Sequence, residues 1–531
     1  MSVNRNREFD LDLLIQQIGP FGKYQLLNFL LICIVVTITV MYTLTFIFTA
    51  GDLKYRCRIP ECDMDKSKLH ETFLNFTTPI DGNKFAMCHR FRHISNATVE
   101  NQCQADLFDQ NNTEDCSEFI KTAKRQSSLS LVGSINNVGQ VVGLALSGYI
   151  SDMFGRRTIL VLSCAFAALI GIIRSFSTSY KMFLILEFLE PVLSAGASTA
   201  TATFILGMEL LCPERRFLGA FFITLFFAFG EALLGVLAMF TKDWVLLLRV
   251  AYAPSFLFIS YLWLIPESVR WLQNKNRTRE AAKIIESAVK MNKSQLTPEA
   301  KTMLRKALQK NYLNKNNDKP QNKEAISKKY RLMSIFESRV LLLRILNCCF
   351  CWMSIEFVYN GLSMNSVSVA GNKYINYILS CLTGIPGSTF SCIFMEKIGR
   401  RNIISITLIL SSFCCISYIF LSNAPEAVQL VVFLIGKSLS SMSYVTIYVY
   451  TTELFPTELR HTLMSICNMV GRIGPIFAPH TVLLRKYIES LPMILFASVA
   501  LPAGILILFA PETHKTTLPD TIQEAEDIGV R

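Results

Sequence analysis

The chain alternates long apolar stretches with polar segments along its whole length. Twelve stretches of about 19 residues or more are nearly free of charge, and each is long enough for a helix to cross ~30 Å of hydrocarbon. Helices are the expected form, because lipid cannot satisfy backbone N–H and C=O groups. The predicted spans are about Leu26–Phe48, Ser128–Ile150, Thr158–Phe176, Met182–Leu210, Phe217–Phe240, Val245–Ile265, Val340–Leu362, Tyr374–Phe394, Ile403–Leu421, Val428–Thr451, Thr462–Leu484 and Pro492–Ala510.

Composition agrees with a membrane protein. Of the 531 residues, 51% are hydrophobic and only 17% are charged, which is too little charge to coat several soluble domains. The length and this composition also exclude a disordered protein, a collagen-like protein and a small disulfide-stabilised scaffold. The first 22 residues are polar and contain no apolar stretch of the signal-peptide type, so we expect the first span to be retained.

A polar loop over residues 49–125 is predicted to be extracellular. It carries N-x-Ser/Thr sequons at Asn75, Asn96 and Asn111, which are candidate glycosylation sites. Clustered cysteines are typical of an oxidising compartment. Five is an odd number, so at most two disulfides form within the loop, and the pairing cannot be read from the sequence. The disulfide candidates are Cys57, Cys62, Cys88, Cys103 and Cys116.

A second polar loop, over residues 266–338, explains the net charge of +12. It contains seventeen Lys and Arg against seven Asp and Glu, an excess of ten positive charges. Basic loops stay in the cytoplasm, so the charge indicates orientation rather than nucleic acid. Asn276 and Asn292 also lie in sequons but are expected to be unglycosylated here. Both termini are then cytoplasmic, because twelve spans is an even number.

Three short motifs recur at one spacing, which indicates an internal repeat. Asp152–Arg157 and Glu396–Arg401 share an acid, a glycine and two arginines at an offset of 244 residues. Glu209–Arg216 and Glu453–Arg460 follow at the same offset, and Pro-Glu pairs end the sixth and twelfth spans. The sequence therefore predicts two parallel six-helix halves joined by the basic loop.

These motifs are expected to form a cytoplasmic gate. An acid at the end of one helix can pair with arginines in the next turn, and such pairs can break when a carrier changes conformation. Simple positive-inside anchoring explains the arginines but not the repeated acids. The predicted gate residues are Asp152, Gly155, Arg156, Arg157, Glu209, Arg216, Glu267, Arg270, Glu396, Gly399, Arg400, Arg401, Glu453, Arg460 and Glu512.

The motifs resemble the major facilitator superfamily, and more closely its organic cation, anion and zwitterion (carnitine-type) solute carriers, in an insect-like version. Segments that carry the resemblance are Gly19–Gln25, Cys57–Cys62, Pro266–Leu272 and Glu453–Arg460. It implies the major facilitator fold, an all-α membrane protein, and transport of small charged organic molecules by alternating access. Two features depart from the family: a sixth loop cysteine is absent, and Glu187 and Glu190 stand where the fourth helix commonly carries an arginine.

Charged residues inside the spans are candidate substrate ligands, because such charges are costly and usually functional. The resemblance implies that an arginine at the position of Arg472, with Lys437, marks the anion and carnitine-type carriers. Two cations in a low-dielectric cavity favour a carboxylate or sulfate. Internal salt bridges with nearby acids are the alternative.

Acids and aromatic side chains are the other substrate-site candidates. Glu356 shares a helical face with Trp352 and Tyr359, and an acid beside aromatic rings suits an ammonium group. The resemblance places the acid of the cation carriers one residue earlier, so the direction of Glu356 stays open. The remaining candidates are Glu231, Phe227, Tyr444 and Tyr448.

The predicted organisation is a cytoplasmic segment (1–25), a six-helix bundle (26–265), the basic loop (266–338), a second bundle (339–510) and a cytoplasmic tail (511–531). The predicted function is a multi-pass plasma-membrane transporter that favours organic anions or zwitterions, with an organic cation as the alternative substrate. A channel or receptor fits the repeat less well, and no nucleotide, metal or other cofactor motif indicates an enzyme. The expected partners are a small organic ion, membrane lipid and a co- or counter-transported ion whose identity the sequence does not give.

Overall fold

The computed structural model divides the chain into two compact units. A helical unit contains Met1–Ile47 and Ser130–Arg531, and a smaller unit contains Phe48–Leu129. The structure describes residues 14, 17–19, 22–49, 55–57, 59, 62, 74–81, 84–85, 89–93, 103, 105–115, 119–121, 127–194, 206, 216–275, 277–309, 338–369, 371–421, 423–456, 460–485, 487–514, 519 and 522–528.

The N-terminal bundle contains helices at all six predicted positions. The span predicted over Met182–Leu210 is described only in its first half, apart from Leu206. The helices are α2 (Lys23–Leu44) with α3 (Phe46–Thr49), α5 (Ser127–Phe154), α6 (Arg156–Arg174), α7 (Tyr180–Leu193), α9 (Arg216–Thr241), and α10 (Trp244–Tyr252) continued by η3 (Ala253–Ser260) and α11 (Tyr261–Leu264).

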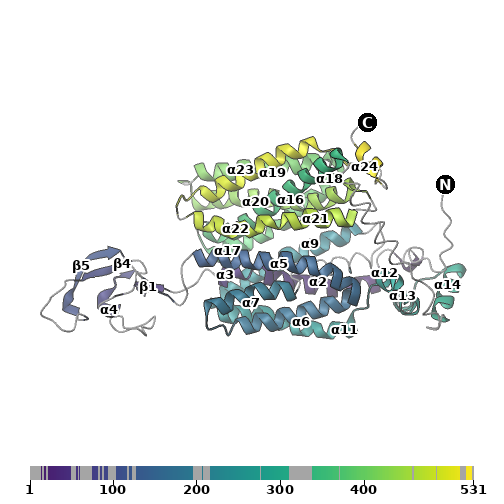
Figure 1. Cartoon of the computed structure of the whole chain (residues 1–531), viewed down its shortest axis with the longest axis horizontal. Helices are drawn as coiled ribbons and strands as arrows, with labels where there is room; N and C mark the ends of the chain where they lie inside the picture. The colour runs from purple at the N-terminus through teal and green to yellow at the C-terminus, as the bar shows by residue number, and fades with distance from the viewer. Residues whose placement is uncertain are drawn as a thin grey trace. The chain divides into compact units, whose positions relative to one another are not determined.

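The C-terminal bundle repeats this arrangement. Its helices are α16 (Arg339–Asn365), α17 (Lys373–Leu382) with α18 (Gly384–Ile398), α19 (Arg400–Phe420), α20 (Glu426–Leu454), α21 (Arg460–Gly471) with α22 (Ile473–Leu484), and α23 (Leu491–Leu506) with η5 (Ile507–Phe509). The two groups of helices lie side by side, and α9 of the first packs on α17 and α18 of the second (Figure 1).

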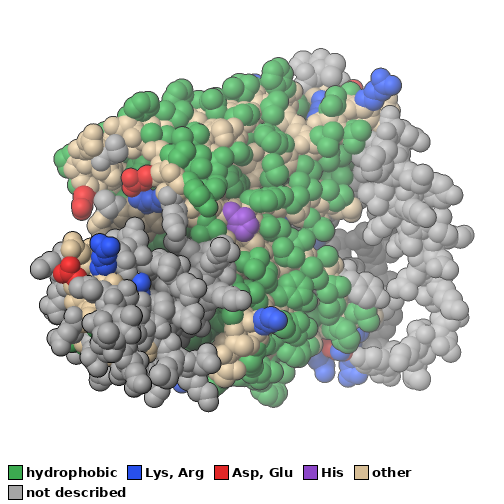
Figure 2. Space-filling view, turned by 60° about the vertical axis from the view of Figure 1, so that its left-hand side comes forward, with side chains coloured by type: hydrophobic (Ala, Val, Ile, Leu, Met, Phe, Trp, Pro, Cys, Tyr) green, Lys and Arg blue, Asp and Glu red, His purple; other side chains and the backbone are tan. Residues whose placement is uncertain are grey.

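The outer surface of the helical unit suits lipid. Figure 2 shows apolar side chains over much of the visible face, and exposed aromatic side chains include Trp263 (80% exposed) and Phe420 (82%). In the described part of the chain, nine helical segments are long and apolar enough to cross a membrane. The predicted all-α membrane architecture is therefore confirmed, and most span boundaries agree within a few residues.

The repeated glycine turns are built alike in both bundles. Gly155 joins α5 to α6 with φ = 98°, and Gly399 joins α18 to α19 with φ = 96°. This left-handed region favours glycine. A Cβ at Gly155 would lie 2.4 Å from Glu267, and one at Gly399 would lie 2.6 Å from Glu512. Glycine therefore supplies both the backbone conformation and the room for a carboxylate.

Each of these carboxylates caps the helix that follows the glycine. Oε1 of Glu267 accepts hydrogen bonds from the backbone N–H groups of Arg156 (2.8 Å) and Arg157 (3.0 Å). Oε1 of Glu512 accepts from the backbone N–H of Arg400 at 2.8 Å. The first N–H groups of a helix lack partners within it and attract negative charge, so a carboxylate stabilises this end.

Four helices outside the two bundles lie at one end of the helical unit. They are α12 (Val269–Asn274), α13 (Thr278–Asn292), α14 (Pro298–Gln309) and α24 (Ile522–Asp527), as Figure 1 shows. The side chain of Asn292 fixes α13 to the start of α2. Its Oδ1 accepts from the backbone N–H of Tyr24 (2.8 Å), and its Nδ2 donates to Ile18 O (3.2 Å) and Gln25 Oε1 (2.7 Å).

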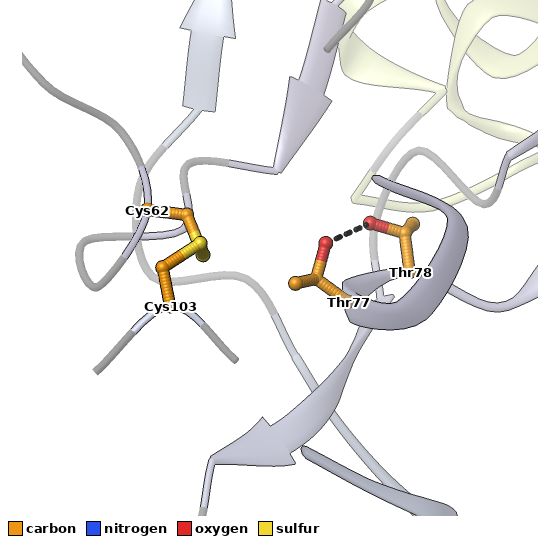
Figure 3. Close-up of a disulfide and its surroundings, with 4 residues drawn as sticks. All are labelled: Cys62, Thr77, Thr78 and Cys103. Carbon is orange, nitrogen blue, oxygen red and sulfur yellow. Dashed lines mark hydrogen bonds between the residues drawn. A yellow bond between two sulfur atoms is a disulfide. The ribbon is translucent and has the colours of Figure 1, made fainter. Parts of the chain in front are cut away.

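The described part of the smaller unit contains short antiparallel strands, the helical turn α4 and the 3-10 turn η1 (Ala105–Leu107). Strand β1 (Tyr55–Cys57) pairs with β6 (Phe119–Lys121), β2 (Ile80–Asp81) with β3 (Lys84–Phe85), and β4 (His89–His93) with β5 (Phe108–Asp115), while α4 spans Leu74–Thr77. Cys62 and Cys103 form a disulfide across 41 residues (Figure 3). A crosslink of that span stabilises a fold by about 4 kcal/mol through the unfolded chain.

Several predictions for this loop concern residues outside the described part of the structure, or residues of which only the backbone is described. Cys88, Cys116 and Asn96 are outside the described residues. Only the backbone is described for Cys57, Asn75 and Asn111. The predicted glycosylation of the three asparagines therefore stays a prediction.

The backbones of α16 and α22 lie so close together that one added methyl group between them should destabilise the protein. A Cβ at Gly474 would lie 2.5 Å from Met353 O and 2.7 Å from Phe357 N. Because backbone atoms cannot move aside like a flexible side chain, Gly474→Ala should destabilise the protein by about 1–3 kcal/mol. The thermal midpoint of the purified protein in detergent measures this. Gly384→Ala is the control, since its Cβ would have neighbours only at 3.6 and 3.7 Å, and an equal loss in both variants would contradict the argument.

The carboxylate cap of α6 generates a second prediction. Glu267→Gln keeps the shape but removes the charge, so we expect a loss of about 1 kcal/mol, and a larger loss for Glu267→Ala. Thermal unfolding can be followed with a dye that reacts with cysteines such as Cys33 and Cys164, which are buried in the folded unit. Glu286→Gln is the control, because this side chain is 40% exposed. Thermal midpoints equal to that of the wild type in Glu267→Gln, Glu267→Ala and Glu286→Gln would contradict the capping role of Glu267.

Candidate functional site

The four charged residues singled out inside the spans lie in two connected pairs. Glu231 is on α9, Glu356 on α16 and Lys437 on α20, and each is at most 2% exposed. Arg472 lies between α21 and α22, with 19% of its side-chain surface exposed. Glu231 belongs to the N-terminal bundle and the other three to the C-terminal bundle, so the site lies where the bundles meet.

A break in a helix places Arg472. Pro475 lacks an N–H, and its ring crowds the carbonyl four residues earlier, so α21 ends at Gly471 and α22 begins at Ile473. Asn137 of α5 donates to Pro475 O at 3.1 Å, and Ser134 donates to Ile476 O at 2.6 Å. The break therefore also joins the C-terminal bundle to α5 of the N-terminal bundle.

Glu356 points into this site, which answers the question of its direction. Its Oε1 accepts from the Tyr444 hydroxyl at 3.3 Å, and its Oε2 accepts from Asn360 Nδ2 at 3.0 Å. Arg472 Nη1 lies 3.9 Å from the same Oε2, at the outer limit of an ion pair. Within the described part of the chain, Nε of Arg472 has no hydrogen-bond partner. Arg472 thus keeps donor capacity for a ligand.

Lys437 is fully engaged by its surroundings. Its ammonium donates to Tyr359 O (2.8 Å) and Ser363 Oγ (2.5 Å) and lies 3.1 Å from the ring centroid of Tyr359. It is also attracted by the Glu231 carboxylate, which accepts from the Tyr359 hydroxyl at 3.3 Å. This arrangement matches the internal-pairing alternative for Lys437, in contrast to Arg472.

Aromatic rings line Glu356 on one side. Tyr359 stacks on Tyr444 with centroids 4.9 Å apart, and Tyr444 lies 5.5 Å from Tyr448. Trp352 meets Tyr448 edge to face at 4.5 Å, and its Nε1 donates to Thr451 Oγ1 at 2.9 Å. Four of the five predicted aromatic residues therefore form one chain. The fifth, Phe227, packs on an apolar cluster of α2 and α9.

Two polar residues of this site escaped the sequence analysis. Asn360 lies four residues after Glu356, and Ser363 lies four after Tyr359, so both face the same side of α16 as the predicted residues. That spacing was the available signal. Small polar side chains are common in helices of every kind, so the spacing alone did not mark them.

Several of the predicted gate residues that the structure describes contact residues of their own bundle. Arg400 Nε lies 3.1 Å from Glu453, and Nη2 lies 3.2 Å from Glu396. Side chains of Arg157 and Arg401 donate to the carbonyls of Leu262 (3.0 Å) and Ala510 (3.3 Å), and Arg460 donates to Phe455 O at 3.3 Å.

Not all of the predicted gate can be evaluated. Glu209 lies outside the described residues, and only the backbone is described for Asp152 and Arg216. Arg270 lies within α12 and is partly buried. Breaking and re-forming of these contacts during transport stays a prediction. Groups of three or more potential metal ligands are absent from the described residues.

Comparison with known proteins identifies the family. The family model described as "Major Facilitator Superfamily" matches residues 119–479. The chain is 27% identical to "Organic cation transporter protein" of Drosophila melanogaster, with 98% of this chain and 95% of that protein covered. It is 28% identical to "Organic cation/carnitine transporter 2" of Rattus norvegicus, with 97% and 94% covered. The resemblance stated for the sequence is thereby confirmed.

Solved structures agree on the fold. The xylose transporter XylE from E. coli, in a partially occluded inward-open conformation, matches with a TM-score of 0.62 at 15% identity, covering 92% of this chain and all of that one. An inward-open structure of the same transporter matches with a TM-score of 0.60. At this identity the likeness concerns the fold alone. With the helices, the repeated turns and the family match in agreement, the chain belongs to the Major Facilitator Superfamily, a family of multi-pass membrane transporters.

Proposed function

We propose that the chain transports small zwitterionic or anionic organic molecules by alternating access, with Arg472 as the residue that receives the carboxylate. The observation that carries the proposal is the contrast between the two buried cations. Lys437 is saturated by internal contacts, whereas Arg472 is partly exposed, lies 3.9 Å from Glu356 and has an Nε without a hydrogen-bond partner among the described residues. Guanidinium groups bind carboxylates through paired donors in one plane, which suits this role.

Charge balance at the site favours a zwitterion over a simple anion. Two acids and two bases meet there, so the four side chains sum to zero charge when all are ionised. A zwitterion keeps that sum unchanged, because its carboxylate faces Arg472 and its ammonium faces Glu356. An anion alone adds one uncompensated charge to a low-dielectric site, which costs free energy unless a cation enters with it.

The aromatic residues supply a place for the ammonium group. Tyr444 and Tyr448 lie beside Glu356, and Trp352 packs against Tyr448 at the end of this row of rings. An ammonium on an aromatic face gains about 0.5–2 kcal/mol, and a nearby carboxylate adds Coulomb attraction. Quaternary ammonium compounds with a carboxylate, such as carnitine, contain both required groups.

An organic cation is the second candidate substrate class. The acid among aromatic rings supports it, and so do the names of relatives such as "Organic cation transporter 1" of Caenorhabditis elegans. For a cation, Arg472 would repel the substrate or would stay paired with Glu356. The two candidates therefore differ in what happens when Arg472 loses its charge.

Substitution of Arg472 tests the carboxylate site. In cells that express the chain, we expect Arg472→Gln to reduce uptake of labelled carnitine or β-alanine at least tenfold, because the carboxylate loses a charged bidentate donor worth about 1.5–3 kcal/mol. Arg277→Gln is the control, since Arg277 is 44% exposed and pairs with Glu280 on the surface. Uptake is normalised to the amount of protein in the membrane.

The same uptake assay can also contradict the proposed carboxylate site at Arg472. Tetraethylammonium has no carboxylate, and a urate-like anion has no ammonium. Preferential uptake of tetraethylammonium that survives Arg472→Ala would show an organic cation carrier and refute the proposed role of Arg472.

Substitution of Glu356 separates zwitterions from anions. Glu356→Gln keeps the side-chain volume but removes the partner of an ammonium. We therefore expect carnitine uptake to fall about tenfold or more, while uptake of a urate-like anion is unchanged or rises. Glu426→Gln, in the first turn of α20, is the control. A parallel fall for both substrates would argue that Glu356 only positions Arg472.

A further inference from the structure

A second group of buried ionisable residues lies in the N-terminal bundle, apart from the proposed substrate site. Arg174 is in the last turn of α6, and Glu187 and Glu190 lie on α7. Arg174 and Glu187 are 0% exposed and Glu190 is 2% exposed. Ionisable groups at such depth are costly and call for an explanation.

Arg174 and Glu187 satisfy one another. Nη1 of Arg174 donates to Oε2 of Glu187. Nδ2 of Asn136 donates to Oε1 of the same carboxylate at 3.0 Å. The other Nη of Arg174 donates to the Tyr252 hydroxyl (3.0 Å) and to Thr45 (3.3 Å). The guanidinium and this carboxylate therefore neutralise each other, and both Nη atoms of Arg174 and both oxygens of Glu187 take part in hydrogen bonds.

Glu190 is left without a counter-charge of its own. Within the described part of the chain, its hydrogen-bond donor is the hydroxyl of Ser194, at 3.1 Å. Two carboxylates thus share one guanidinium, which leaves one negative charge in excess when both are ionised. An uncompensated charge in this setting costs several kcal/mol, so an additional positive charge is expected beside Glu190.

Glu190 borders a small cavity with room for about one water-sized occupant. Seven of the eight lining residues carry a side-chain oxygen atom. Thr39 and Thr43 donate their hydroxyl protons to Val35 O and Val40 O, each at 2.8 Å, and neither hydroxyl accepts a hydrogen bond from another described residue. The complete lining is Thr39, Tyr42, Thr43, Asn136, Gln140, Glu190, Pro191 and Ser194.

Tyr42 is an independent sign that the cavity receives a ligand. Its side chain is 4% exposed and stacks on Tyr252 with centroids 4.4 Å apart. Tyr42 lines the cavity, and its buried hydroxyl has no hydrogen-bond partner among the described residues.

We propose that this cavity binds one small monovalent cation, Na⁺ or a proton, held by Glu190. Na⁺ would be coordinated by Glu190 and the surrounding oxygens, whereas a proton would sit on Glu190 itself and be donated to those oxygens. Either ion removes the excess negative charge. The other ionisable groups of the described helices packed around Glu190 are Tyr42, Cys164, Arg174, Glu187 and Tyr252.

Binding of the cation does not depend on the proposed substrate. Coupling of the cation to substrate movement does rest on the proposed function, so the test measures binding to the purified protein alone. A ligand that binds only the folded state raises the thermal midpoint as its concentration rises. Failure of the substrate proposal would leave this measurement unaffected.

The experiment compares thermal midpoints of the full-length protein in detergent. In the first arm, Na⁺ replaces N-methyl-D-glucamine at constant ionic strength and neutral pH. In the second arm, pH falls from alkaline to mildly acidic without Na⁺. We expect the wild type to gain several degrees in one arm. A sodium site responds in the first arm, and a proton site responds in the second.

Three variants make the result specific to the cavity. In Glu190→Gln the side chain carries no charge and needs no bound cation. Its thermal midpoint should therefore stay unchanged in the arm in which the wild-type midpoint rises. Tyr42→Phe keeps the ring stacking but removes one oxygen, and the Na⁺ concentration for half the response should rise severalfold if the ion is Na⁺. Glu489→Gln is the control, with 79% side-chain exposure, and should respond like the wild type.

Two outcomes overturn the proposal. One is a wild-type midpoint that changes in neither arm. The other is a change that persists in Glu190→Gln. If Glu190→Gln does not fold, Thr39→Val and Tyr42→Phe decide, because each removes an oxygen that would coordinate Na⁺ or accept the proton of Glu190. The Na⁺ concentration or the pH of half the response should then shift, and an unshifted response in both variants would contradict a site in this cavity.

Discussion

Every charge among the apolar helices must find an opposite charge or a full set of hydrogen bonds, and this requirement organises the interior of the protein. Lys437 meets it with a carbonyl, a hydroxyl, an aromatic ring and the attraction of Glu231. Arg174 meets it through Glu187 and two hydroxyl groups. Arg472 and Glu190 meet it least completely. The least satisfied charges are therefore the best candidates for contact with a transported molecule or ion.

The same requirement links the two bundles. Glu231 on α9 accepts from Tyr359 on α16, so a polar contact crosses the line between the halves. Movement of one bundle against the other would break it, and the groups released would need new partners. Charged groups of a substrate can supply such partners, which offers a physical reason for substrate binding to favour the movement in the proposed carrier.

Sequence alone gave the spans and the repeat because both depend on local information. The length of an apolar stretch is readable without tertiary structure, and Gly155 and Gly399 stand in matching motifs. The capping role of Glu267 was not readable, because it joins residues 111 positions apart. The saturation of Lys437 depends on a backbone carbonyl of another helix. Pairing of Cys62 with Cys103 likewise needed three-dimensional proximity.

The N-terminal cluster was missed for a different reason. Glu187 and Glu190 were noted as departures from the family, but Arg174 was not connected with them. It stands at the end of an apolar span, where an arginine commonly reaches the membrane surface. Here it turns inward to Glu187, 13 residues away across a short loop. Among Arg174, Lys437, Arg472, Glu187, Glu190, Glu231 and Glu356, acids outnumber bases by one. This imbalance agrees with one bound cation.

Asn292 has a consequence for biosynthesis. It lies in an Asn-Lys-Ser sequon, yet its Nδ2 is the atom that donates to Ile18 and Gln25. An oligosaccharide attached to that nitrogen would displace the start of α2 from α13. Transfer of the sugar takes place in the lumen of the endoplasmic reticulum, often before folding is complete. A chain inserted with this end in the lumen would risk a modification that its own fold cannot accommodate, so the cytoplasmic orientation that the basic loop predicts would protect the contact.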